Sequence, residues 1–243
     1  MENPGLFLPG KKPIGPIVVD WSHPLARGVE ICLPLNRHDI NIVNGERVKV
    51  NGSPIFNVKD GATQLYDWGA DSHLRSKPRL NNGSGAIVIL TSGLHGVGFC
   101  RLVQGGGAGY NNTIIYRNSA DNSIGFRLNN DTAVLYTSGA NALNPVGNIF
   151  GSSELTAPPR FIVLTWDSAK PTRQIWLDGV LADGSSAPFI DAGWGDEINF
   201  FADSASGNDT PGGKKLVLFY SRFLQSDEIL SLTSDPYQFL IPA

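Results

Sequence analysis

Acidic residues form three clusters that could supply a glycosidase with its acid and its nucleophile. The clusters lie at residues 67–71, 195–197 and 226–228. A retaining glycosidase needs two carboxyl groups about 5 to 5.5 Å apart, and carboxylates that alternate along one strand share a face at that spacing. The sequence has no Glu-x-Asp-x-Glu run or similar. The third cluster suits the first turn of a helix and the other two are typical of loops, so we predict no catalytic residue and no enzyme.

The histidines and cysteines do not form the sequence motifs of known catalytic or metal sites. The four histidines contain no i, i+4 pair of the zinc-protease kind, and the glycine-rich segment at 104–112 lacks the Lys-Ser/Thr of a phosphate loop. Cys32 and Cys100 are too few for a closed zinc site. We interpret both cysteines as small buried apolar residues, with a single disulfide bridge between them as the alternative. We interpret His23, which precedes a proline, as a packed structural residue.

Two binding hypotheses stay open beside a purely structural interpretation, namely a calcium site and a sugar-binding tryptophan. Four acidic residues on adjacent candidate loops offer the hard oxygen ligands that calcium prefers: Asp191, Asp196, Asp203 and Asp209. The other interpretation is two solvated acidic turns. Trp194 stands between two glycines, where it either stacks on a sugar ring or caps the core. We expect no cofactor, with calcium as the alternative.

The residues between these clusters are typical of an all-β chain. Short apolar runs rich in β-branched and aromatic residues alternate with turn residues, among them many of the 28 glycines and 16 prolines. Without long helical segments between them, such runs predict antiparallel sheets. The run at 161–167 is apolar on both faces, which predicts a strand in the middle of a sheet with cover on each side.

Short sequence motifs predict two further elements, a hairpin turn and a helix. Asp178 and Gly179 lie between two strand-like runs within residues 173–184, and an Asp-Gly pair favours a hairpin turn. Near the C-terminus, Ser226 is a candidate N-cap followed by Asp227 and Glu228, and Pro236 ends the pattern. We predict a hairpin at the first place and a short helix at the second.

Residues 1–20 are predicted to be an extended N-terminal arm, because proline fixes φ and removes a hydrogen-bond donor. The arm carries apolar residues that need a surface to lie on, either on their own domain or on a partner. These docking candidates are Leu6, Phe7, Leu8, Ile14 and Ile17. Residues 21–243 are predicted to form one sandwich.

Composition excludes several classes. The net charge of −3 and the lack of a basic run argue against a nucleic-acid partner, which needs clustered Lys and Arg. The chain has no apolar run of the length that a bilayer requires, and its first residues lack the pattern of a secretory signal. We therefore expect neither nucleic acid nor membrane as a partner.

Two segments, 159–181 and 214–236, resemble the laminin G-like, concanavalin A-like jelly-roll superfamily. The first resembles its strand ending in Thr-Trp-Asp and its later strand ending in Asp-Gly. The second resembles its last strand and the Tyr-x-Arg-x-Leu ending, with Tyr220, Arg222 and Leu224 in the matching places and Ser226, Glu228 and Ile229 close to them. The segments at 21–36 and 234–243 resemble the ends of such modules in tailed-phage virion proteins.

The resemblance implies a single jelly-roll β-sandwich with the N-terminal arm and one short C-terminal helix. It also implies a non-enzymatic structural protein of a tailed-phage virion, either a capsid decoration or a head or tail fibre-associated protein. Such a protein is made in the bacterial host cytoplasm, resides in the virion, contacts other virion proteins and forms a homo-oligomer, for which we expect a trimer. The alternative is a carbohydrate-binding module that recognises host surface glycans through Trp194.

Overall fold

The computed structural model describes a little over half of the chain. The described residues are 15–34, 40–47, 49–51, 55–59, 62–67, 73–76, 84–91, 111–117, 123–129, 132–137, 140–141, 161–167, 169–170, 172–185, 198–200 and 212–243.

Strands dominate the described residues, with one short 3-10 helix and one α-helix. The elements in chain order are β1 (Ile17–Val19), η1 (Pro24–Ala26), β2 (Val29–Leu33), β3 (Lys49–Asn51), β4 (Ile55–Lys59), β5 (Ala62–Asp67), β6 (His73–Ser76), β7 (Gly85–Thr91), β8 (Asn111–Arg117), β9 (Ser123–Asn129), β10 (Thr132–Thr137), β11 (Ala140–Asn141), β12 (Phe161–Asp167), β13 (Thr172–Leu177), β14 (Val180–Ser185), β15 (Ile198–Phe200), β16 (Gly212–Tyr220), α1 (Ser226–Ser234) and β17 (Leu240–Pro242).

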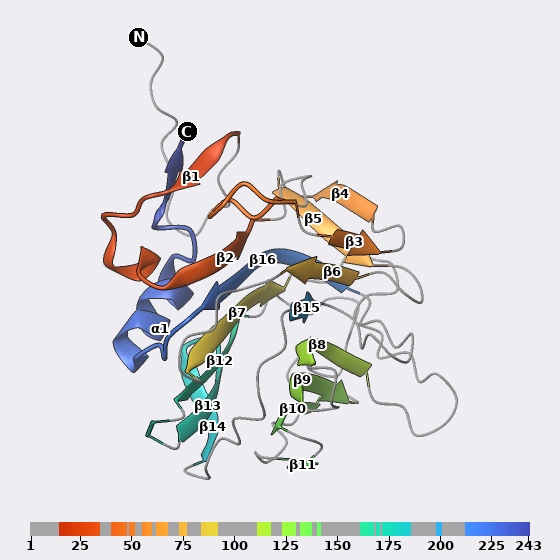
Figure 1. The fold of residues 1–243 in the computed structure, drawn as a ribbon, viewed down its shortest axis with the longest axis vertical. Coiled ribbons are helices and arrows are strands. Elements are labelled where there is room, and N and C mark those ends of the chain that lie inside the picture. Colours follow the sequence, from red (N-terminus) through yellow and green to blue (C-terminus); the bar gives the residue numbers. More distant parts are fainter. Residues whose placement is uncertain are drawn as a thin grey trace.

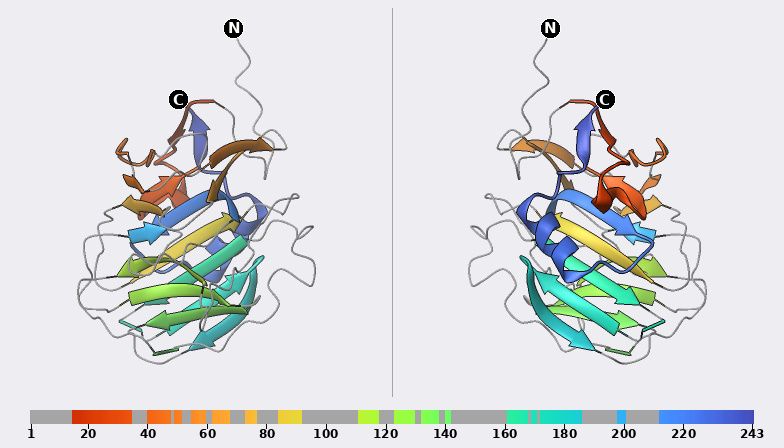
Figure 2. Two further views of the ribbon diagram at one scale, coloured as in Figure 1. Left: turned by 90° about the vertical axis from the view of Figure 1, so that its right-hand side faces the viewer. Right: turned by 90° about the vertical axis from the view of Figure 1, so that its left-hand side faces the viewer.

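Two large antiparallel sheets make up the sandwich (Figure 1). One has the order β14-β13-β12-β7-β16-β5-β4, with β2 also paired to β16, and the other has the order β11-β10-β9-β8-β15-β6-β3. Figure 2 shows the second sheet over one face of the first and α1 on the opposite face. The predicted all-β jelly-roll sandwich with one C-terminal helix is therefore confirmed.

The first sheet is covered on both faces. Along β16, Leu216, Leu218 and Tyr220 belong to the core cluster that also contains Ile229 and Leu232 of α1. Side chains alternate between the two faces of a strand, so Val217 and Phe219 point to the opposite face, and they too are buried. The helix thus covers one face of a sheet whose other face lies inside the sandwich.

Strand β12 confirms the prediction for a doubly apolar run. It pairs with β7 on one side and β13 on the other, and residues 161–166 are all buried. Trp166 lies so close to Gly85 of β7 that an added Cβ on the glycine would come 2.5 Å from the indole. Glycine is therefore required at residue 85 to admit the buried ring.

The Asp-Gly hairpin is also confirmed, since Asp178 and Gly179 connect β13 to β14 with φ angles of 51° and 80°. These are left-handed conformations, which glycine and aspartate tolerate better than most residues. The Asp178 carboxylate accepts a hydrogen bond from the Phe161 amide at 2.9 Å. Asp178 therefore stabilises the turn and fixes the start of β12.

The first described residues pair with the last ones. Strand β1 lies antiparallel to β17, with Ile17 opposite Pro242 and Val19 opposite Leu240. Val19 and Leu240 are buried, whereas Val18 and its partner Ile241 are exposed. This two-stranded ribbon joins the end of the predicted arm to the C-terminal segment. The other docking candidates, Leu6, Phe7, Leu8 and Ile14, lie outside the described residues.

The C-terminal helix corrects one prediction. Helix α1 begins at Ser226 and its N-cap is Gln225, so the prediction of Ser226 as the cap was wrong by one residue. The reason is that Glu228 at the third helical position accepts a hydrogen bond from the Gln225 amide at 2.9 Å. Over the residues that the structure describes, no helix has both the length and the apolar character needed to span a bilayer.

Candidate functional site

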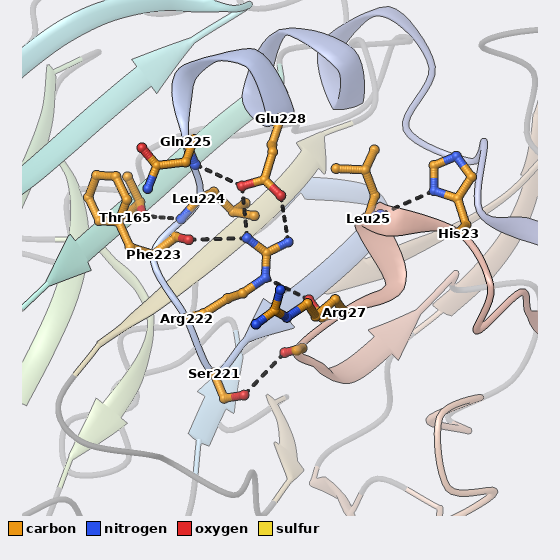
Figure 3. A network of polar contacts seen from close by, with 11 residues as sticks. His23, Leu25, Arg27, Thr165, Ser221, Arg222, Phe223, Leu224, Gln225 and Glu228 are labelled. Atoms are coloured by element: carbon orange, nitrogen blue, oxygen red, sulfur yellow. Dashed lines mark hydrogen bonds and ion pairs between the residues drawn. The ribbon is translucent and has the colours of Figure 1, made fainter.

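The most connected polar cluster among the described residues lies where β16 leads into α1 (Figure 3). Arg222 forms a two-pronged ion pair with Glu228, with nitrogen–oxygen distances of 2.7 and 2.8 Å. Its Nε donates to the Arg27 carbonyl at 2.7 Å, and Nη1 also donates to the Phe223 carbonyl at 3.2 Å. The guanidinium thus connects two segments 195 positions apart in the sequence. We call Arg222, Glu228 and these partners the Arg222 corner.

The electrostatics of the Arg222 corner do not suit acid–base chemistry. Burial alone would raise the pKa of Glu228, but hydrogen bonds from Arg222 and the Gln225 amide, with the charges of Arg222 and Arg27, hold that pKa below its ordinary value. An effective general acid or base has a pKa near the working pH and a lone pair or proton to exchange. Glu228 is ionised and its oxygens accept three hydrogen bonds. The cluster therefore serves the fold.

One neighbour extends the Arg222 corner into the core, and a second, His23, lies at the helix η1 that precedes Arg27. The buried Thr165 hydroxyl of β12 accepts a hydrogen bond from the Leu224 amide at 3.0 Å. On the N-terminal side, His23 Nδ1 accepts from the Leu25 amide at 3.2 Å, and its ring packs 6.4 Å from that of Phe239. His23 caps η1, which confirms its predicted structural role.

A second polar arrangement lies at the surface, in the segment that we call the Asp20–Ser22 turn. Asp20 Oδ1 accepts hydrogen bonds from the Ser22 amide at 3.0 Å and the Ser22 hydroxyl at 2.6 Å. These bonds, opposed in part by a small desolvation and aided by the charge of His23, lower the pKa of Asp20. Trp21, between the two polar residues, is 58% exposed.

The candidate ligand-binding residues from the sequence cannot be compared with this geometry. Trp194 and the four calcium candidates, Asp191, Asp196, Asp203 and Asp209, all lie outside the described residues, as does Cys100. Cys32 is buried and free, as expected, and burial raises the pKa of its thiol. Within the described ranges, no three His, Cys, Asp or Glu residues gather into a metal site.

Sequence reasoning did not single out Trp21. Its signal is the placement of an aromatic residue between Asp20 and Ser22, which are both residues typical of turns. A large side chain at a turn that leads away from a strand has few neighbours to bury it. That pattern indicates an exposed Trp21 side chain. The indole alone does not identify a ligand that would bind to it.

No protein-family profile matches the sequence, and no curated protein matches it. Solved structures do match it at the level of the fold. One is domain 4 of AbnA, a GH43 extracellular arabinanase from Geobacillus stearothermophilus, solved in complex with arabinotriose. It is 10% identical, the match covers 84% of this chain and 98% of that domain, and the TM-score is 0.59.

Two other similar structures are toxin binding domains. The binding domain of Paraclostridial Mosquitocidal Protein 1 is 13% identical over 86% of this chain and 52% of that one, with a TM-score of 0.63. The receptor-binding domain of botulinum neurotoxin type G is 13% identical over 78% of this chain and 46% of that one, with a TM-score of 0.58. The chain spans about half the length of these two toxin domains.

These likenesses establish the fold that the chain shares with other proteins. The three structures are β-sandwich domains: one was solved with arabinotriose, one is a receptor-binding domain, and one is described as a binding domain. At these identities a shared fold does not transfer a ligand, because function depends on the site and not on the scaffold.

Proposed function

We propose that this chain is a non-catalytic carbohydrate-binding module that recognises glycans on a cell surface. The observation that carries the proposal is the likeness to the arabinanase domain, because the match covers 98% of that domain and so includes a whole module solved with a sugar. Among the described residues, Glu228 fits a non-catalytic module, because its carboxylate is held in the Arg222 corner.

The experiment is a glycan array probed with the whole chain, with and without calcium. Reproducible binding to one class of glycan is expected. Trp194→Ala tests the glycan candidate from the sequence, and Asp196→Asn combined with Asp203→Asn tests the calcium candidates. Leu230→Ala is the control, since it shortens an exposed apolar residue of α1. An array without any binding would contradict the proposal, as would turnover of a polysaccharide that depends on Asp196 or Glu197.

A second candidate is a structural role in a tailed-phage virion, and it is favoured by the resemblance of the two terminal segments to such proteins. In this role the module would sit on the capsid or tail, contact other virion proteins and form a homo-oligomer. The ring of His23 lies 6.4 Å from that of Phe239, which makes the two resembling segments neighbours in space. Mass spectrometry of purified particles tests the location, and light scattering tests the expected trimer. A chain absent from particles and monomeric in solution would contradict this second candidate.

A further inference from the structure

The tryptophans with described side chains differ sharply in exposure. Trp166 is 1% exposed and fills the core. Trp176 is partly buried against the core and donates its indole N–H to Gln174 Oε1 at 3.0 Å. Trp21 has neither arrangement and is 58% exposed. A single exposed apolar residue is common on protein surfaces, so the setting of Trp21 decides what it can do.

The backbone around Trp21 is held on both sides. The Asp20 amide donates to the Phe239 carbonyl at 2.9 Å, and the His23 amide donates to the Asp20 carbonyl at 3.0 Å. Phe239 is buried in the core cluster, so the Asp20–Ser22 turn is tied to the well-packed part of the sandwich. A preorganised surface binds with less ordering cost than a mobile one.

The polar groups of the same turn complement the aromatic face. A carboxylate has about four lone-pair sites, and Ser22 uses two of those on Asp20. The remaining sites can accept hydrogen bonds from hydroxyl groups, since an aspartate is ionised near neutral pH and the Ser22 hydrogen bonds lower the pKa of Asp20 further. An aromatic plane and a charged acceptor thus lie within three consecutive residues.

A pyranose ring matches this pair of features. Its axial C–H groups form an apolar patch that stacks on an indole, while its hydroxyls donate to a carboxylate, and aromatic residues combine both kinds of contact well. The negative charge of Asp20, on a chain of net charge −3, disfavours uronic and sialic acids through like-charge repulsion. We propose that the Asp20–Ser22 turn is a glycan subsite in which Trp21 stacks on a neutral pyranose and Asp20 accepts its hydroxyls. This inference rests on the proposed carbohydrate-binding function.

The probes are neutral oligosaccharides of glucose, galactose and mannose, together with matched oligouronates and sialylated oligosaccharides. The whole chain is titrated with each by isothermal calorimetry. A neutral oligosaccharide is expected to bind best. Trp21→Ala is expected to raise its Kd by about tenfold or more, which corresponds to about 1.4 kcal/mol, and Trp21→Phe by less, because a smaller aromatic face remains.

Matched variants separate this subsite from the proposed function as a whole. Leu230→Ala removes another exposed apolar side chain and is expected to leave Kd unchanged, and circular dichroism checks that each variant is folded. If Trp21→Ala leaves Kd unchanged while Trp194→Ala abolishes binding, the subsite is overturned and the carbohydrate-binding function stands. A preference for the acidic sugars also overturns the subsite alone. If the wild-type chain binds none of the probes and no glycan on the array, both are overturned.

Discussion

The Arg222 corner and the Asp20–Ser22 turn are built from similar polar residue types but serve different ends. In the corner, the guanidinium donates four hydrogen bonds to three partners, and the side chains of Arg222 and Glu228 are 24% and 21% exposed. In the turn, the hydrogen bonds hold only the backbone and the Asp20 carboxylate, and Trp21 stays in water.

The difference shows how a polar cluster can be assigned to the fold or to a ligand. Ionised groups whose hydrogen-bonding capacity is met by the protein stabilise it and have little left for a substrate. Groups fixed in place but turned to solvent keep that capacity. The corner belongs to the first kind and the turn to the second.

Among substitutions in the Arg222 corner and the Asp20–Ser22 turn, removing the Arg222 guanidinium should have the largest effect on stability. Arg222→Met keeps most of the side-chain volume but leaves the Glu228 carboxylate and the Arg27 carbonyl without their shared donor. We expect a loss of about 2 to 3 kcal/mol in the free energy of unfolding, measured in urea, since hydrogen bonds to charged groups contribute about 1.5 to 3 kcal/mol. Lys170→Met, which removes an exposed cation, is the control. Equal effects from the two substitutions would show that the corner is not structural.

Removing the negative charge of Glu228 should lower the free energy of unfolding by a smaller amount, and the direction of its pH dependence can be stated. The folded-state pKa of Glu228 is lowered, so its contribution is complete above the ordinary glutamate pKa of about 4.3 and is lost as pH falls through the lower folded-state value. We expect Glu228→Gln to destabilise the protein at pH 7 by less than Arg222→Met does.

Urea unfolding at pH 7 and pH 3 measures the stability gap between wild type and Glu228→Gln. The gap should narrow at the lower pH, where the wild-type carboxylate begins to take up a proton. A gap that stays constant would mean that folding does not lower the pKa of Glu228.

The smallest effect on stability is expected for the turn. Trp21→Ala should change the free energy of unfolding by at most about 1 kcal/mol, because the side chain is largely solvated. Trp166→Ala should cost about 3 to 5 kcal/mol, the usual range for a buried aromatic residue. Thermal or urea unfolding of both variants measures the contrast. A large loss from Trp21→Ala would assign the turn to the fold rather than to a ligand.

Local patterns in the sequence were sufficient for much of the sandwich. The doubly apolar run of β12 predicted its place inside a sheet, and Asp178 with Gly179 predicted the hairpin. Both are decided by residues close together in the chain. The start of α1 was misjudged by one residue because Glu228, three positions into the helix, caps the amide of Gln225.

Contacts between residues far apart in the chain could not be predicted from the sequence. Nothing local to Ile17 indicates Pro242 as its partner, and nothing local to Arg222 indicates the carbonyl of Arg27. Such contacts depend on how the whole chain packs. The exposure of Trp21 was different, because the turn residues Asp20 and Ser22 beside it were a local signal that was overlooked.

The position of β16 has a consequence for how the protein is made. This strand, at residues 212–220, pairs with β2, β5 and β7. These three strands are synthesised much earlier and stay without a pairing partner at that edge until β16 is made. A ribosome-bound chain that has not yet exposed residue 220 lacks the strand that joins them, and their unpaired backbone edges are available for wrong partners. Productive folding of this sheet therefore cannot finish before residue 220 has left the ribosome, and chaperones that shield nascent strands should raise the yield of native protein.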